Sequence, residues 1–289
     1  MRIGMWMTGW MTLGCARPVS TVPAGFHPPA EAAWEVPGPL VHEAVISARW
    51  SVPLSGLLDL KDPRAAEFED RPYDIVLPVH VLVHPEVGAF VIDTGMPRAP
   101  LAARGLVARF VRDIEIVEPL ADILSRQQAP LVGVLLTHTH LDHILGLPDV
   151  PLEVPVYAGP GDERPHSMSD RLSFGAFRRG LGDRPLTLWR FEAAAPLGPI
   201  EHAVDVLGDG SLWALHVPGH TPGSTAYLAR TTHGPVLFTG DCSHTRWGFD
   251  HGVTPGTYTV DHEANAHSLE ALRALAASIP GLRVEVGHE

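Results

Sequence analysis

Lysine and cysteine are scarce in this sequence, and long uninterrupted apolar runs are missing. The 289 residues include a single lysine, Lys61, and the formal net charge is -12. Binding to nucleic-acid phosphates needs clustered lysine and arginine, so this balance argues against a nucleic-acid partner. The two cysteines, Cys15 and Cys242, are too few for a disulfide framework or a cysteine-rich zinc site. No internal apolar run is long enough to span a bilayer as a helix.

Histidine, by contrast, is abundant, with 17 residues. Because histidine is the commonest metal ligand, this number favours a metal site without locating one. The chain is long enough to bury a large core, and we expect residues 41–289 to form one domain of α/β class.

The first forty residues differ in character from the rest. Arg2 is followed by a mostly apolar stretch from Ile3 to Gly14, and then by Cys15. This order is typical of a secretory leader, and the cysteine after a small residue resembles a bacterial lipoprotein signal. We therefore expect a leader over residues 1–15, a proline-rich linker over 16–40, and export to the periplasm. Membrane attachment would occur only through a lipid on Cys15, and the alternative is a cytoplasmic protein with an apolar tail.

Short apolar runs separated by turn signals predict strands in two blocks, each followed by a helix. The predicted strands span residues 41–50, 79–84, 89–94, 131–137, 154–158, 186–191, 203–207, 212–217, 225–229, 236–239 and 283–286. Helices are predicted over 101–111, 120–128 and 264–279, and an irregular segment with some helix over 159–182. This pattern favours two sheets packed face to face with helices outside.

The strongest chemical signal is the segment from Thr137 to His143. Three imidazoles and one carboxylate follow directly after a buried apolar run, in the order His138, His140, Asp142, His143. A strand end is rigid and opens at the edge of a sheet, so it can aim several side chains into one pocket. Imidazole and carboxylate ligands suit zinc, and also iron, manganese or cobalt.

The His-x-His-x-Asp-His string resembles the signature of the metallo-β-lactamase superfamily. Four further segments resemble the family in the family's order: residues 90–95, ending in Asp-Thr-Gly; 219–224, Gly-His-Thr-Pro-Gly-Ser; 237–241, ending in Gly-Asp; and 286–289, containing Gly-His. The resemblance implies a four-layer αβ/βα sandwich with the site at one edge of the two sheets.

The resemblance also implies a set of ligands for two divalent metal ions, zinc in the first place. One ion would be held by His138, His140 and His220, the other by Asp142, His143 and His288, and Asp241 would bridge the two. A hydroxide between the ions would be the nucleophile. Asp142 would lie close enough to take or give its proton. Asp93 either hydrogen-bonds a ligand or forms a structural turn.

Two features direct the resemblance towards lactone or ester hydrolysis. Asp241 and the segment from Val91 to Pro97 resemble the N-acyl-homoserine lactonases. Those enzymes carry a tyrosine three residues after the bridging aspartate, where it contacts the substrate carbonyl, but this chain has His244. An imidazole there would donate a hydrogen bond to an oxyanion, or His244 is an idle residue at the pocket rim.

The expected function is therefore hydrolysis of a small-molecule lactone or ester. Three alternatives stay open. The first is a β-lactamase-like amide hydrolase of the all-histidine branch, and the second is a glyoxalase-type thioesterase. The third is a degenerate member that binds metal without turnover.

Overall fold

The computed structural model describes residues 34–99, 111, 113–165 and 170–289. The predicted leader, the lipid on Cys15, most of the predicted linker and nearly all of the predicted helix 101–111 lie outside these residues. Among the described residues, none of the helices is both long enough and apolar enough to cross a bilayer.

Seven strands form the first sheet, in the order β4-β1-β2-β3-β5-β6-β7. Their bounds are β1 Val41–Pro53, β2 Pro72–His84, β3 Gly88–Ile92, β4 Glu115–Ile116, β5 Leu131–Leu135, β6 Val156–Ala158 and β7 Leu186–Leu188. β1 and β2 form a long antiparallel pair, whereas β3, β5, β6 and β7 run parallel. Because parallel strands end at the same edge of a sheet, the residues that follow β3 and β5 lie close together.

Six strands form the second sheet, in the order β13-β12-β11-β10-β9-β8. Their bounds are β8 Ala195–Leu197, β9 Ile200–Asp205, β10 Leu212–His216, β11 Thr225–Thr231, β12 Gly234–Phe238 and β13 Arg283–Glu285. Neighbouring strands are antiparallel except β12 and β13, which run parallel and so end on the same side.

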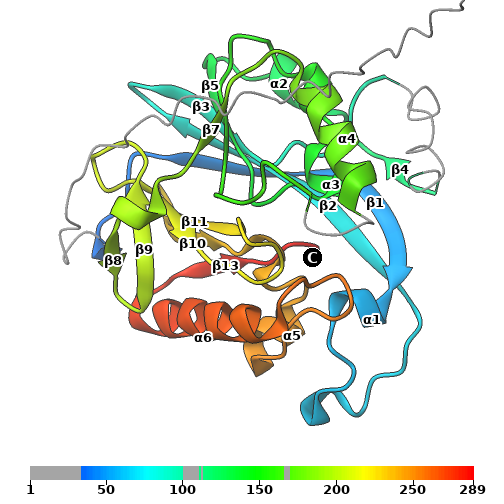
Figure 1. Cartoon of the computed structure of the whole chain (residues 1–289). Helices are drawn as coiled ribbons and strands as arrows, with labels where there is room; N and C mark the ends of the chain where they lie inside the picture. The colour runs from blue at the N-terminus through cyan, green and yellow to red at the C-terminus, as the bar shows by residue number, and fades with distance from the viewer. Residues whose placement is uncertain (1–33, 100–110, 112, 166–169) are drawn as a thin grey trace, which may run out of the picture.

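Helices cover the outer faces of both sheets, as Figure 1 shows. Their bounds are α1 Leu54–Leu57, α2 Leu120–Ser125, α3 Leu141–Ile144, α4 Asp170–Leu181, α5 Arg246–His251 and α6 His262–Ser278, with short 3-10 turns at 63–65, 147–149, 191–193 and 240–242. Side chains alternate along each strand. On β11, Tyr227 therefore packs between the two sheets, while Leu228 packs against the layer that contains α6. On β3, Val91 likewise packs in the outer core that contains α2, α3 and α4. The predicted four-layer αβ/βα sandwich is confirmed.

A pair of histidines, His80 buried and His42 half-buried, connects β1, β2 and β13. Arg283 Nη2 donates to His42 Nδ1 at 2.8 Å, so His42 Nε2 carries the proton and donates to His80 Nδ1 at 3.2 Å. Both rings are therefore neutral. Burial, with the positive charge of Arg283, lowers the pKa of His42 to about 4. Burial and the His42 ring lower the pKa of His80 to about 3.

This pair predicts a specific acid sensitivity of the metal-free protein. The unfolded chain protonates His80 near the ordinary histidine pKa of 6.5, but the folded chain does so only near 3. The contribution of His80 to stability is therefore constant above about pH 6.5 and falls as the pH drops below it, by about 2 kcal/mol at pH 5. Urea unfolding at pH 7 and pH 5 measures how much free energy of unfolding is lost between the two pH values. This loss should be smaller in His80→Phe than in the wild type. The exposed His267→Gln variant should lose as much as the wild type, and an unchanged loss in His80→Phe would contradict the assignment.

Candidate metal centre

The His-x-His-x-Asp-His segment occupies the loop between β5 and α3, at the edge where the parallel strands end. His138 and His143 are buried, at 0% and 5% exposure, whereas His140 and Asp142 are half-buried. The site is therefore most open on the side of His140 and Asp142.

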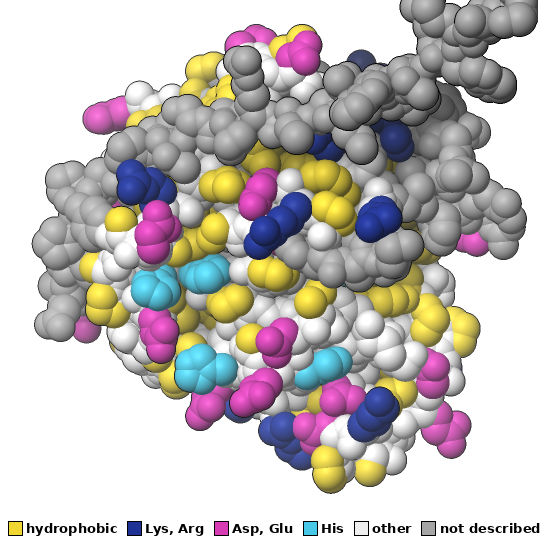
Figure 2. All heavy atoms as spheres, viewed as in Figure 1, with side chains coloured by type: hydrophobic (Ala, Val, Ile, Leu, Met, Phe, Trp, Pro, Cys, Tyr) yellow, Lys and Arg dark blue, Asp and Glu magenta, His cyan; other side chains and the backbone are white. Residues whose placement is uncertain are grey.

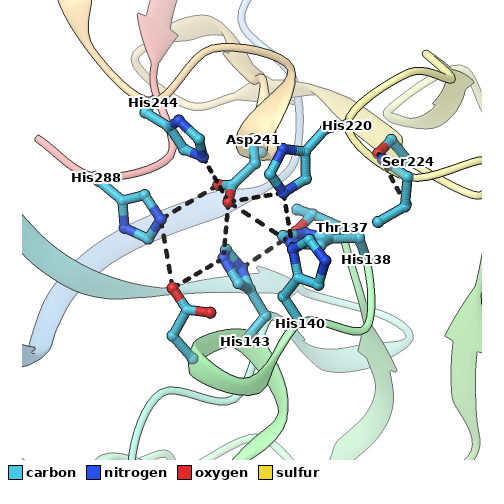
Figure 3. A network of polar contacts seen from close by, with 12 residues as sticks. Thr137, His138, His140, His143, His220, Ser224, Asp241, His244 and His288 are labelled. Carbon is cyan, nitrogen blue, oxygen red and sulfur yellow. Dashed lines mark hydrogen bonds and ion pairs between the residues drawn. The ribbon is translucent and has the colours of Figure 1, made fainter. Parts of the chain in front are cut away.

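The other three predicted ligands come from loops of the second sheet. His220 lies between β10 and β11, Asp241 directly follows β12, and His288 follows β13. Gly287 is needed for the close approach of two of these loops, because a Cβ there would lie 2.4 Å from Asp241 Oδ1. Figure 3 shows the side chains pointing toward one another from both sheets.

The donor atoms fall into groups that share Asp241. Within each of four groups, the donor atoms lie within 4.8 Å of one another: His138, His140 and His220; His138, His143 and Asp241; Asp142, His143 and His288; and His220, Asp241 and His244. Asp241 Oδ2 lies 3.6, 3.4 and 3.4 Å from the Nε2 atoms of His138, His143 and His220. Its other oxygen, Oδ1, lies 3.4 Å from His288 Nε2.

These distances and the chemistry of the donors fit metal ions. Two atoms that each lie about 2.0–2.1 Å from a tetrahedral zinc ion are about 3.4 Å apart. Several buried atoms of the group, moreover, make no hydrogen bond: His138 Nε2, His143 Nε2, His220 Nδ1 and Asp241 Oδ1. A buried polar atom without a partner is costly, and bound cations would supply partners for the atoms that face Asp241.

The electrostatics differ between members of the cluster. At His143 and His288 burial lowers the pKa, but Asp241 and the other carboxylates outweigh it and raise the pKa, so coordination by these rings would displace a proton. Burial lowers the pKa of His138 and of His220 well below the usual histidine value, so both rings are in the neutral form that binds metals. Burial acts in the opposite direction on Asp241, but the surrounding histidines, His244 first, outweigh it and hold its pKa well below the usual range. Asp241 is therefore ionised, and no proton competes with a metal ion for its oxygen atoms.

Asp93, at the end of β3, orients His143. It is the only described non-glycine residue with a left-handed backbone, at φ 57°. Its carboxylate accepts hydrogen bonds of 2.8 Å from the backbone N and the hydroxyl of Thr137 and from His143 Nδ1. Because Nδ1 of His143 donates to Asp93, Nε2 is the ring atom that faces Asp241 and Asp142, at 3.4 and 3.6 Å. This contact supports the hydrogen-bonding alternative for Asp93.

Replacing Asp93 with asparagine should weaken metal binding by about 10- to 100-fold. The asparagine amide would present N–H groups to the N–H of His143, and the ring would turn away from the other donors. Competition with a chelating dye measures the affinity, and the unfolding temperature of the metal-free variant checks that the fold is kept. Wild-type affinity in Asp93→Asn would contradict this role.

His244 lies deeper than the pocket-rim alternative assumed. It is 2% exposed, which does not fit the pocket-rim alternative. Its Nδ1 donates to the carbonyl of Leu57 at 3.2 Å, and its Nε2 lies 2.9 Å from Asp241 Oδ2. Both ring nitrogens thus have protein partners, so a substrate oxygen would have to displace one of them. The role of His244 as an oxyanion donor stays a prediction.

Asp162 is a site residue that the sequence interpretation missed. It is fully buried, and its carboxylate accepts from the hydroxyl of Thr221 at 3.2 Å and from the backbone N of Gly223 at 3.1 Å. Asp162 thereby holds the loop that carries His220. The only available signal was an acidic residue in the Gly-rich segment after a strand, which is weak evidence on its own.

The structure brings all eight predicted site residues together from four separate segments of the chain. Seven are the predicted ligands His138, His140, Asp142, His143, His220, Asp241 and His288, and the eighth is His244. Their roles as ligands and as catalytic groups remain predictions that the geometry favours.

Comparison with known proteins points to one family. The sequence profile described as Metallo-beta-lactamase superfamily matches residues 77–288. The chain is similar to the N-acyl homoserine lactonase AttM of Azorhizobium caulinodans, with 28% identity over 228 residues that cover 75% of this chain and 83% of that protein.

Solved structures are similar in fold. A quorum-quenching N-acyl homoserine lactone hydrolase superposes with a TM-score of 0.63 at 19% identity, covering 86% of this chain and 91% of that chain. AidC, described as a dizinc quorum-quenching lactonase in complex with a product, gives a TM-score of 0.56 at 15% identity, covering 87% and 88%.

Proposed function

Because the chain belongs to the metallo-beta-lactamase superfamily and is a metal-dependent hydrolase, we propose that it holds two divalent metal ions and hydrolyses lactones. The observation that carries the proposal is the arrangement of donors around Asp241. Two separate groups of three, His138, His140 and His220 on one side and Asp142, His143 and His288 on the other, both lie next to this one carboxylate.

The chain's own residues would fix the ions and handle the proton. Asp241, without a competing proton, would bridge the two groups. Bound there, two divalent ions, zinc in the first place, would activate a water molecule between them and polarise the substrate carbonyl. Asp142 is the most exposed carboxylate of the cluster, with 16% of its side chain accessible, and its Oδ2 lies 3.5 Å from His288 Nε2. It is therefore placed to exchange a proton with the substrate side.

A small lactone is the substrate class with the most support. The match to the N-acyl homoserine lactonase AttM extends over 83% of that protein, and a protein described as a dizinc lactonase shares the fold. On the face drawn in Figure 2, the described basic side chains are interspersed with acidic ones and form no continuous stripe. This surface suits a small neutral substrate better than a polyanion.

Turnover assays with the metal-loaded enzyme test the proposal. The panel contains N-acyl-homoserine lactones, simple lactones, p-nitrophenyl esters, a glutathione thioester and the β-lactam nitrocefin. We expect the acyl-homoserine lactones to show the highest kcat/KM.

The other members of the panel decide between the alternatives. Nitrocefin cleavage without lactone turnover would replace lactone hydrolysis with β-lactamase-like activity. Preference for the glutathione thioester would indicate a glyoxalase-type enzyme. A protein that binds metal and hydrolyses none of these compounds would contradict the proposed function.

A further inference from the structure

A segment outside the predicted motifs lies next to the loop that carries His220. The segment 256–261, between α5 and α6, passes beside α1 and close to the C-terminal end of the chain in Figure 1. The backbone N of Thr257 donates to the carbonyl of Ser55 at 2.9 Å, and that of Val260 donates to the carbonyl of His220 at 3.1 Å. The segment is therefore fixed at one end to α1 and at the other to the loop of a predicted ligand.

Two large apolar side chains on this segment face solvent. Tyr258 is 43% exposed and Val260 is 47% exposed, and they flank the buried Thr259. Exposed apolar side chains that a rigid backbone holds beside a polar site commonly contact the apolar part of a ligand. A single exposed apolar side chain elsewhere on the surface would not indicate a ligand contact.

The Tyr258 ring packs against a residue that has no side chain, Gly56. A Cβ at position 56 would lie 2.1 Å from Cε2 of Tyr258, so the ring rests directly on the backbone of Gly56 in α1. Partial burial and then the nearby carboxylates, Asp142 first, raise the pKa of the Tyr258 phenol. The phenol thus lies within electrostatic range of Asp142, the most exposed carboxylate of the cluster.

We infer that Tyr258, with Val260 beside it, binds the apolar substituent of the substrate and so sets the preference for acyl-chain length. The inference rests on the proposed lactone hydrolysis, because it needs a substrate with an apolar chain next to the reacting carbonyl. The ring supplies packing area to a part of the substrate that does not react. Its loss should therefore weaken binding and leave the chemical step nearly unchanged.

The test compares binding of a short and a long ligand to the metal-loaded full-length protein. Calorimetry gives Kd for N-butanoyl- and N-decanoyl-homoserine, the ring-opened products, so the readout does not depend on turnover. We expect Tyr258→Ala to raise Kd about ten-fold for the decanoyl compound and less than about two-fold for the butanoyl compound. Tyr258→Phe keeps the ring and should bind both as the wild type does.

Val87→Ala is the matched control. Val87 has the same 43% exposure, but it lies in the β2–β3 turn, at the opposite end of β3 from Asp93. It should change neither Kd. Equal losses for both ligands in Tyr258→Ala, no loss for either, or a wild type that binds neither compound would overturn the inference. A wild type that binds the long ligand more tightly but opens no lactone would contradict the proposed function and leave the role of Tyr258 intact.

Discussion

Replacing Asp241 with asparagine is expected to lower kcat/KM by at least about 10³-fold and to reduce the number of bound metal ions. Asp241 is the only described carboxylate that lies within 3.6 Å of His138, His143 and His220 and also close to His288. A neutral amide would remove the negative charge that both groups share. It would also place N–H groups against ring nitrogens that need their lone pairs. Elemental analysis and lactonase kinetics of the same preparation measure the effect.

Asp205→Asn is the control for the loss of a buried carboxylate. Asp205 is also buried, at 4% exposure, and it accepts from the backbone N atoms of Gly208 and Gly210 at the end of β9. Its replacement should cost stability while both ions and the activity are kept. If Asp241→Asn keeps two ions and wild-type activity, Asp241 does not bridge the two groups.

Removal of the metal ions is expected to abolish turnover and to lower the unfolding temperature by roughly 8–16 °C. A ligand at about 1,000 times its Kd stabilises the folded state by about 4 kcal/mol, and each kcal/mol shifts the midpoint of a domain of this size by about 2–4 °C. The physical source is the set of buried donors without hydrogen bonds, which the ions would pair. Dialysis against a chelator followed by thermal unfolding measures the shift.

Addition of zinc should then restore both the midpoint and the activity, whereas calcium, which prefers oxygen ligands, should restore neither. A protein freed of metal that still hydrolyses lactones at the wild-type rate would contradict the account. Loss of activity with an unchanged midpoint would mean that the ions contribute nothing to the stability of the fold.

The sequence predicted the centre because each site motif directly follows a recognisable structural element. The apolar run of β5 leads into Thr137 to His143, and the runs of β12 and β13 lead into Asp241 and His288. A strand that ends at a sheet edge constrains the position of the next few residues. The order of the motifs therefore predicted both the superfamily, which the profile match confirms, and the fold.

Element bounds were less predictable where the local pattern is interrupted. β2 begins at Pro72 rather than at Val79, because Pro72, Asp74 and Pro78 break the apolar alternation. Pairing with β1 nevertheless continues to the Pro53↔Pro72 contact. Tertiary packing outweighs local propensity there. The helix expected within the stretch 159–182 is present as α4, which has twelve residues.

Side-chain orientation within the site could not be read from the sequence at all. The inward position of His244 depends on the carbonyl of Leu57, 187 residues earlier in the chain. The Tyr258 ring can pack where it does because α1 presents the bare backbone of Gly56. No motif encodes such long-range contacts.

The most direct test of the account is an anomalous diffraction experiment at the metal absorption edge on crystals of the metal-loaded protein. We expect two peaks per chain, one among His138, His140 and His220 and one among Asp142, His143 and His288, each within about 2.0–2.2 Å of its ligands and both in contact with Asp241. A single peak, peaks elsewhere, or none in protein that hydrolyses lactones would contradict the binuclear centre on which the proposed function depends.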